Sequence, residues 1–141
     1  MEYHDAGPVA YADAVLAMSA HRYGDHDAIH SLEYGETQTY AELDERASRA
    51  ARALTDRGVE PGDRIGLFLP NTLQFPETFY GAIRTGAVPV PLNLRMDLDT
   101  LAYVLSDADA DHLVRRASAC RILGEGCATG LTRTVPEGVT L

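Results

Sequence analysis

The order of short apolar segments and longer amphipathic segments limits the folds open to this chain more than any other feature. Apolar runs of strand length occupy residues 65–69, 87–92 and 111–114. Two segments of helical length separate these runs, and each has its apolar side chains at helical spacing. The order strand, helix, strand, helix, strand predicts a parallel sheet with right-handed crossovers, which is an α/β fold.

The two helical segments between these strands have recognisable ends. Asn71 is expected to cap the first helix, with Pro76 in its first turn and Gly86 at its end. Gly81 inside this helix costs about 1 kcal/mol relative to alanine, and close packing against a sheet is expected to offset that loss. Asp97 is expected to cap the second helix. The predicted buried faces are Phe75, Phe79 and Ile83 in the first helix, and Leu98, Leu101 and Leu105 in the second.

A helix and a β-hairpin are predicted before this unit. Residues 9–23 have apolar side chains at helical spacing, and a glycine follows them. Residues 28–32 and 37–40 flank a short turn that contains Gly35, as expected of two antiparallel strands.

The strongest local signal is a capping box at the start of the next helix. Thr39 and Glu42 have the spacing at which each side chain accepts a hydrogen bond from the other residue's backbone N–H. Apolar residues then recur at helical spacing over residues 40–57, and Gly58 is expected to end the helix. Pro61–Gly62 fits the centre of a type II turn that leads into the first parallel strand.

Two prolines mark the strand predicted at residues 87–92. Pro89 and Pro91 lack N–H groups on the same side of the strand. We therefore expect this strand to be fully paired on one side only.

The apolar pattern weakens after residue 116. A fourth helix is expected over residues 117–123, and residues 117–141 as a whole are expected to form an irregular tail. Residues 1–116 are predicted to form one partial subdomain. A partial sheet leaves an unpaired edge, so self-association through that edge is also expected.

Charge and composition exclude several classes of function. The chain has 21 acidic and 12 basic residues and a net charge of -9, which argues against nucleic acid or an anionic membrane as its main partner. All basic residues are arginine, so no lysine is present to bind phosphate or form a Schiff base. No transmembrane or signal segment is apparent, a cytoplasmic location is expected, and Cys120 and Cys127 are expected to be reduced.

Four motifs in order resemble those of the AMP-forming adenylation enzymes, which include the acyl-CoA synthetases. Thr39–Leu43 (TYAEL) resembles the first core motif of that superfamily, and Arg84–Asn93 (RTGAVPVPLN) is similar to the second. Gly58–Arg64 (GVEPGDR) and Leu69–Asn71 (LPN) lie between them in the family's order. The likeness runs from about residue 12 to residue 114, and within the superfamily it is greatest to fatty-acid and related acyl-CoA ligases.

The resemblance implies a function for a larger protein than this chain. Such enzymes use ATP to convert a carboxylate to an acyl-adenylate and then transfer the acyl group to coenzyme A. The complete enzyme would use ATP, Mg²⁺ and coenzyme A. The family's phosphate loop with its lysine, its adenine and magnesium segment, its ribose aspartate and its lid lysine are all absent from this sequence. Without these charges, adenylyl transfer loses most of its acceleration, so we expect the isolated chain to be inactive and to hold no cofactor.

Two hypotheses follow from this resemblance. In the first, the chain is the amino-terminal part of an acyl-CoA synthetase, and its partner is the remainder of the adenylation domain. In the second, it is a free-standing, non-catalytic module that docks on a companion adenylation subunit or binds an acyl or coenzyme A ligand weakly.

The resemblance implies a ligand contact for Arg95 alone. Arg95 stands where some acyl-CoA ligases carry an arginine near the phosphates of coenzyme A, although Leu94 replaces the usual proline. A guanidinium group suits a phosphate at the carboxyl end of a strand. The alternative is that Arg95 caps loop carbonyls.

Three other polar features favour ordinary structural roles. His26 and His30 lie in a segment that runs from a turn into a strand, which separates the two rings too far for a metal site. Ser48 has no histidine or aspartate partner of a catalytic triad nearby in sequence. The glycines of residues 124–130 miss the spacing of a nucleotide-binding loop.

Overall fold

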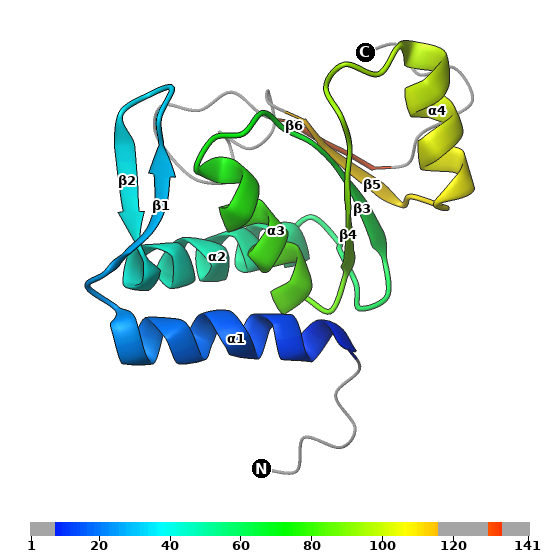
Figure 1. Cartoon of the computed structure of the whole chain (residues 1–141). Helices are drawn as coiled ribbons and strands as arrows, with labels where there is room; N and C mark the ends of the chain where they lie inside the picture. The colour runs from blue at the N-terminus through cyan, green and yellow to red at the C-terminus, as the bar shows by residue number, and fades with distance from the viewer. Residues whose placement is uncertain (1–7, 116–129, 134–141) are drawn as a thin grey trace.

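A computed structural model describes residues 8–115 and 130–133 of the chain (Figure 1). The described part has both helices and strands, and it begins with a helix and a hairpin as the sequence predicts. The elements are α1 (Pro8–Tyr23), β1 (Asp27–Ser31), β2 (Glu36–Thr39), α2 (Tyr40–Thr55), β3 (Arg64–Phe68), α3 (Gln74–Arg84), β4 (Val88–Pro91), α4 (Leu98–Asp107), β5 (His112–Arg115) and β6 (Gly130–Arg133).

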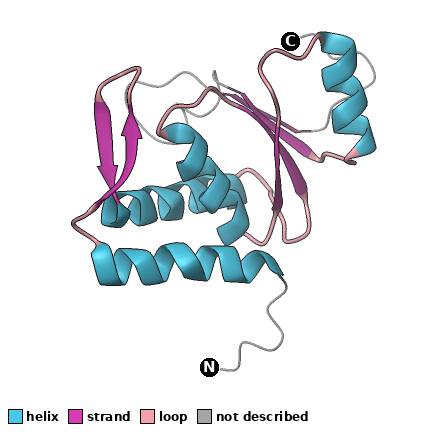
Figure 2. Ribbon diagram, viewed as in Figure 1, coloured by secondary structure: helices cyan, strands magenta, loops and turns pink. Residues whose placement is uncertain are grey.

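The main sheet confirms the predicted parallel unit. Its strand order is β4-β3-β5-β6, and β3 pairs in parallel with both β4 and β5. The helix α3 connects β3 to β4, and the helix α4 connects β4 to β5. Because β4 and β5 lie on opposite sides of β3, these two connections run in opposite directions along the sheet. The two helices cover opposite faces (Figure 2), which gives both crossovers the same hand.

Each face of the sheet has its own apolar core. Alternate residues of β3 point to opposite faces, so Ile65 and Leu67 face α2 and α3 while Phe68 faces α4. A third cluster joins α1, α2 and the hairpin. The three sets of buried residues are Leu54, Val59, Ile65, Leu67, Leu69, Ala82, Ala87 and Val114; Leu92, Leu101, Leu105 and Leu113; and Leu16, Leu43 and Ala47.

The start of α3 differs from the prediction. Asn71 does not cap this helix, because a turn intervenes and the N-cap is Leu73, which makes no side-chain cap hydrogen bond. Within this turn, the N–H of Thr72 donates to the carbonyl of Pro70. Pro76 does lie in the first turn, where its missing N–H has no partner within the helix to lose.

Gly81 packs against a helix rather than against the sheet. A Cβ atom added to Gly81 would lie 2.6 Å from Cβ of Ala50 and 3.1 Å from the carbonyl oxygen of Ala47, both in α2. The prediction that Gly81 packs closely was right, but the predicted partner, the sheet, was wrong. Glycine lets the backbones of α2 and α3 approach more closely than any side chain would allow.

The two prolines make β4 an edge strand, as predicted. Within the described residues β4 pairs only with β3. The flanking N–H groups of Val88 and Leu92 donate to the carbonyls of Asp63 and Leu67, at 2.8 and 3.0 Å. Pro89 lies between these donors on the opposite side of the strand, where it presents no N–H.

The prediction of an irregular tail over residues 117–141 is wrong for residues 130–133. These residues form β6, which pairs antiparallel with β5. A short strand without period-2 alternation leaves little signal in the sequence, and its place depends on β5 as a template. The helix expected over residues 117–123 lies outside the described residues.

Candidate functional site

The carboxyl ends of the parallel strands form the edge at which open α/β sheets usually bind ligands. The loop that follows β4 carries Arg95 at this edge. Its backbone is fixed, because the N–H of Arg95 donates to Oδ1 of Asn93 at 2.9 Å and the N–H of Met96 donates to the carbonyl of Asn93 at 3.1 Å. Asp97 then caps α4 by accepting a hydrogen bond from the N–H of Thr100 at 2.8 Å, as predicted.

The side chain of Arg95 is exposed beyond this fixed loop. Among the described residues this side chain forms no hydrogen bond or ion pair, and the contact at 2.9 Å to Oδ1 of Asn93 comes from the backbone N–H of Arg95. The neighbouring side chains of Leu94 and Leu98 are also exposed. This arrangement suits a ligand that has both a phosphate and an apolar portion.

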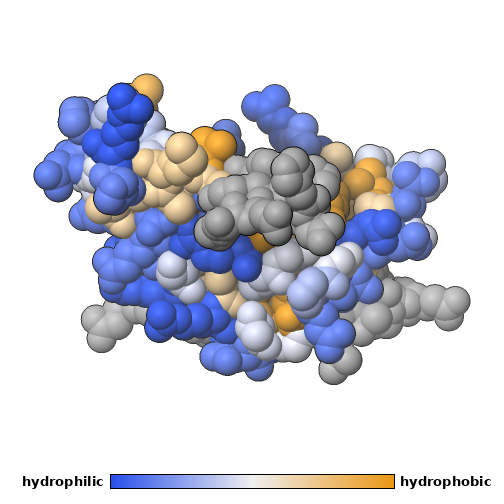
Figure 3. Space-filling model, turned by 90° about the horizontal axis from the view of Figure 1, so that it is seen from below, coloured by the Kyte–Doolittle hydropathy of each residue, from blue (hydrophilic) through white to orange (hydrophobic). Residues whose placement is uncertain are grey.

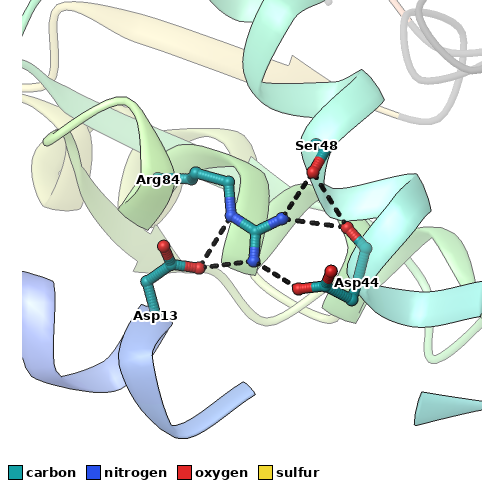
Figure 4. A network of polar contacts seen from close by, with 4 residues as sticks. All are labelled: Asp13, Asp44, Ser48 and Arg84. Carbon is teal, nitrogen blue, oxygen red and sulfur yellow. Dashed lines mark hydrogen bonds and ion pairs between the residues drawn. The ribbon is translucent and has the colours of Figure 1, made fainter. Parts of the chain in front are cut away.

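The densest polar network in the described part of the chain lies elsewhere, around Arg84 at the end of α3 (Figure 4). Nε and Nη2 of Arg84 contact Oδ1 of Asp13 in α1 at 2.7 and 2.6 Å. Nη2 also contacts Oδ1 of Asp44 in α2 at 2.8 Å, and Nη1 donates to the carbonyl of Asp44 and to Oγ of Ser48 at 2.9 and 2.7 Å. All three nitrogens of the guanidinium group therefore contact a partner, through four hydrogen bonds and a further ion-pair contact to Asp13.

This network holds the fold together and leaves no donor for a ligand. Burial alone lowers the pKa of the Arg84 guanidinium, but hydrogen bonds to Asp13 and Asp44 outweigh it and hold that pKa above its ordinary value. Ser48 donates to the carbonyl of Asp44 and accepts from Arg84, so it has no catalytic base among the described residues. Sequence reasoning missed Arg84, because its partners in α1 and α2 lie 71, 40 and 36 positions away.

The two histidines of the hairpin region contact different neighbours. Nε2 of His30 lies 3.5 Å from Oδ2 of Asp27, and its Nδ1 lies 3.3 Å from Oγ1 of Thr37. His26 packs edge-on against the ring of Tyr23 instead. Across the described residues, no three His, Cys, Asp or Glu side chains gather closely enough to hold a metal ion.

Two other predictions concern membrane-spanning segments and the glycines of residues 124–130. None of the helices in the described ranges has both the length and the apolar character needed to cross a membrane. Of the glycine segment at residues 124–130, only residue 130 is described, and it begins β6.

A comparison with known protein families shows the family of this chain. A family model with the description AMP-binding enzyme matches residues 16–136. The chain belongs to the AMP-binding enzyme family. The match extends from within α1 to beyond β6, so the whole described sheet of this AMP-binding chain lies inside it.

Relatives of this AMP-binding chain are named as ligases and synthases. It is 36% identical over 85 residues to the long-chain-fatty-acid–CoA ligase FadD13 of Mycobacterium tuberculosis, which covers 60% of this chain and 17% of that ligase. It is 38% identical over 104 residues to a feruloyl-CoA synthase of an Amycolatopsis species, which covers 74% of this chain and 21% of that enzyme. The crystal structure of the N-terminal domain of FACL13 from Mycobacterium tuberculosis matches with a TM-score of 0.68 and 33% identity, over 72% of this chain and 25% of that one.

These matches confirm the predicted superfamily and the predicted amino-terminal subdomain. The AMP-binding chain spans about a fifth of the length of the curated relatives named here. Their activities belong to proteins several times longer than the part aligned.

Proposed function

We propose that this chain supplies the amino-terminal part of an AMP-forming acyl-CoA ligase. The observation that carries the proposal is the family match over residues 16–136, joined to relatives that are named as CoA ligases and CoA synthases. In the complete enzyme, ATP and Mg²⁺ would activate a fatty or other carboxylic acid as its adenylate, and coenzyme A would accept the acyl group. A cytoplasmic location, where ATP and coenzyme A are available, is part of the proposal.

The proposed contribution of this chain is shape rather than catalysis. Its sequence lacks lysine and the phosphate-loop motif that the chemistry needs. Its described residues form a four-stranded sheet in the order β4-β3-β5-β6, beside a two-stranded hairpin. The partner that fits this role is the remainder of the same adenylation domain.

The DNA that follows codon 141 in the gene tests this proposal. We expect an in-frame continuation into a loop rich in threonine, serine and glycine. A stop codon followed by a transcription terminator would contradict the proposal and favour a free-standing, non-catalytic module.

Self-association through a sheet edge stays part of the proposal, although β4 is poorly suited to it. Pro89 and Pro91 leave the outer side of β4 with few N–H donors for another strand. The net charge of -9 also opposes the approach of two copies.

Arg95 is proposed to contact a phosphate of coenzyme A. Its exposed guanidinium lies on a fixed loop at the carboxyl edge of the sheet, and it has no partner within the described residues. Replacing Arg95 with alanine is expected to raise the Kd for coenzyme A about tenfold, because one charged hydrogen bond is lost. Isothermal titration of the chain measures this change.

The matched control for Arg95→Ala is Arg52→Ala. Arg52 is also exposed, lies on α2, and its loss changes the net charge by the same amount. The Kd of the Arg52→Ala variant for coenzyme A is expected to stay within twofold of the wild-type value. Equal weakening by both variants would show a nonspecific charge effect and contradict a contact at Arg95.

A further inference from the structure

A buried glutamate joins the hairpin to the helix pair. Glu77 lies in α3 and only 1% of its surface is exposed, while Gln38 of β2 is 2% exposed. Nε2 of Gln38 donates to Oε1 of Glu77 at 2.6 Å. This contact links residues 39 positions apart, so it ties the β1–β2 hairpin to α3.

One oxygen on each of these two side chains is left over. Oε2 of Glu77 and Oε1 of Gln38 are both buried, and neither has a hydrogen-bond partner among the residues that the structure describes. An ionised carboxylate and an amide oxygen only accept hydrogen bonds, so they cannot satisfy each other. A proton on Oε2 would turn that oxygen into a donor and provide a partner for the amide oxygen.

Nearby positive charge does not replace that proton. The closest guanidinium nitrogen, Nε of Arg46 in α2, is 3.6 Å from Oε1 of Glu77, which is the oxygen that Gln38 already satisfies. The side chain of Arg46 is 44% exposed, so water screens its charge. A buried carboxylate whose second oxygen is unpaired is strongly disfavoured in such a site.

We propose that Glu77 is a neutral carboxylic acid that pairs with Gln38 through two hydrogen bonds, and that this acid–amide pair is a pH-sensitive latch between the hairpin and α3. The amide N–H of Gln38 donates to Oε1, and the acid O–H on Oε2 donates to the amide oxygen. Loss of the proton breaks the second bond and leaves a buried negative charge.

The charges around Glu77 act in both directions. Burial raises the pKa of Glu77 above its ordinary value of 4.5, and it outweighs the lowering by the Gln38 hydrogen bond and by Arg46. Glu36 of β2 raises the pKa further, and Arg49 of α2 lowers it. Since the folded state keeps the proton over a pH range in which the unfolded state releases it, the contribution of Glu77 to stability is complete below its ordinary pKa of 4.5 and is lost as the pH rises through the folded pKa.

The test compares wild type with Glu77→Gln in urea unfolding as a function of pH. In wild type, the Glu77 contribution raises the unfolding equilibrium constant by up to about tenfold per pH unit above the ordinary glutamate pKa. Glu77→Gln is expected to lose this dependence, because a glutamine at that position forms the same two hydrogen bonds without a titrating proton. An unchanged pH dependence in Glu77→Gln would overturn the proposal.

Glu33→Gln is the matched control. It makes the same chemical change at an exposed position in the turn of the same hairpin. The control is expected to keep the wild-type pH dependence of unfolding. If Glu33→Gln and Glu77→Gln flatten the pH dependence equally, the effect belongs to net charge and the latch is refuted.

Infrared spectroscopy tests the protonation of Glu77 in the wild-type chain itself. At about pH 5.5, an exposed glutamate is mostly ionised. Across a pH series, the infrared C=O stretch of protonated carboxyls should therefore persist to higher pH in the wild-type chain and in Glu33→Gln than in Glu77→Gln. A band that disappears over the same pH range in wild type and in Glu77→Gln would overturn the proposal.

A double variant that carries both Gln38→Glu and Glu77→Gln distinguishes the effect of the acid–amide pair from the effect of burial. It exchanges the acid and the amide, so the two hydrogen bonds return and the pH dependence of unfolding should return with them. A reversed pair that folds but titrates at the ordinary glutamate value would contradict the acid–amide geometry.

Discussion

Arg84 shows how one residue can hold three helices together. Its side chain is 18% exposed, and its guanidinium group contacts carboxylates from α1 and α2, a backbone carbonyl and a hydroxyl. Arginine presents its five donors in a rigid fork, which lysine cannot imitate. The network therefore depends on arginine, and it belongs to the scaffold rather than to a reaction.

Replacing Arg84 with alanine is expected to destabilise the chain by about 2 kcal/mol, since it leaves two half-buried carboxylates without their cation. Replacement by lysine should recover the charge but only part of that loss. Urea denaturation measures both changes. The control is Arg49→Ala, whose ion pair with Glu45 is exposed and should be worth less than about 0.5 kcal/mol. Similar losses at Arg84 and Arg49 would contradict the bracing role.

At the scale of elements, features that depend on residues close together in sequence were predicted well. Features that depend on tertiary contacts were not. The capping box at Thr39 and Glu42 is present, with hydrogen bonds of 2.9 and 3.2 Å, because it depends on residues three positions apart. The glycines predicted to end α2 and to shape the turn before β3 have positive φ angles, as their roles require. Asn71 failed as a cap because α3 begins later, after a turn, with Leu73 as its N-cap.

The contact between α2 and α3 at Gly81 is expected to tolerate no side chain. Gly81→Ala should destabilise the chain by about 2 kcal/mol, although alanine favours helix formation, because its Cβ would lie 2.6 Å from Cβ of Ala50. Adding Ala50→Gly should make the double variant less destabilised than the sum of the two single changes. Chemical denaturation of all three variants gives this coupling.

Gly66→Ala is the comparison for this prediction. A Cβ at Gly66 would first meet the end of the Leu105 side chain, at 2.7 Å, and that group can turn away. Its cost should therefore be smaller than that of Gly81→Ala. The reverse order would show that the two helices separate easily and that their close packing is not the constraint.

At the scale of the molecule, the sequence predicted the parallel unit, the edge position of β4 and the family. It predicted neither β6 nor the three-helix brace, because both depend on partners far away in sequence. Hydrophilic and hydrophobic residues are interspersed on the face seen in Figure 3. Arg95 was the one site residue that the sequence offered, and the fold puts it at the carboxyl edge of the sheet without testing its role.

We propose that this chain shapes part of an adenylating enzyme and does not carry out the reaction by itself. Incubation of the purified chain with ATP, Mg²⁺ and fatty acids, followed by measurement of AMP, tests it most directly. We expect no AMP above the background without protein, because the sequence has neither the phosphate loop nor any lysine. AMP production that depends on the fatty acid would contradict the account.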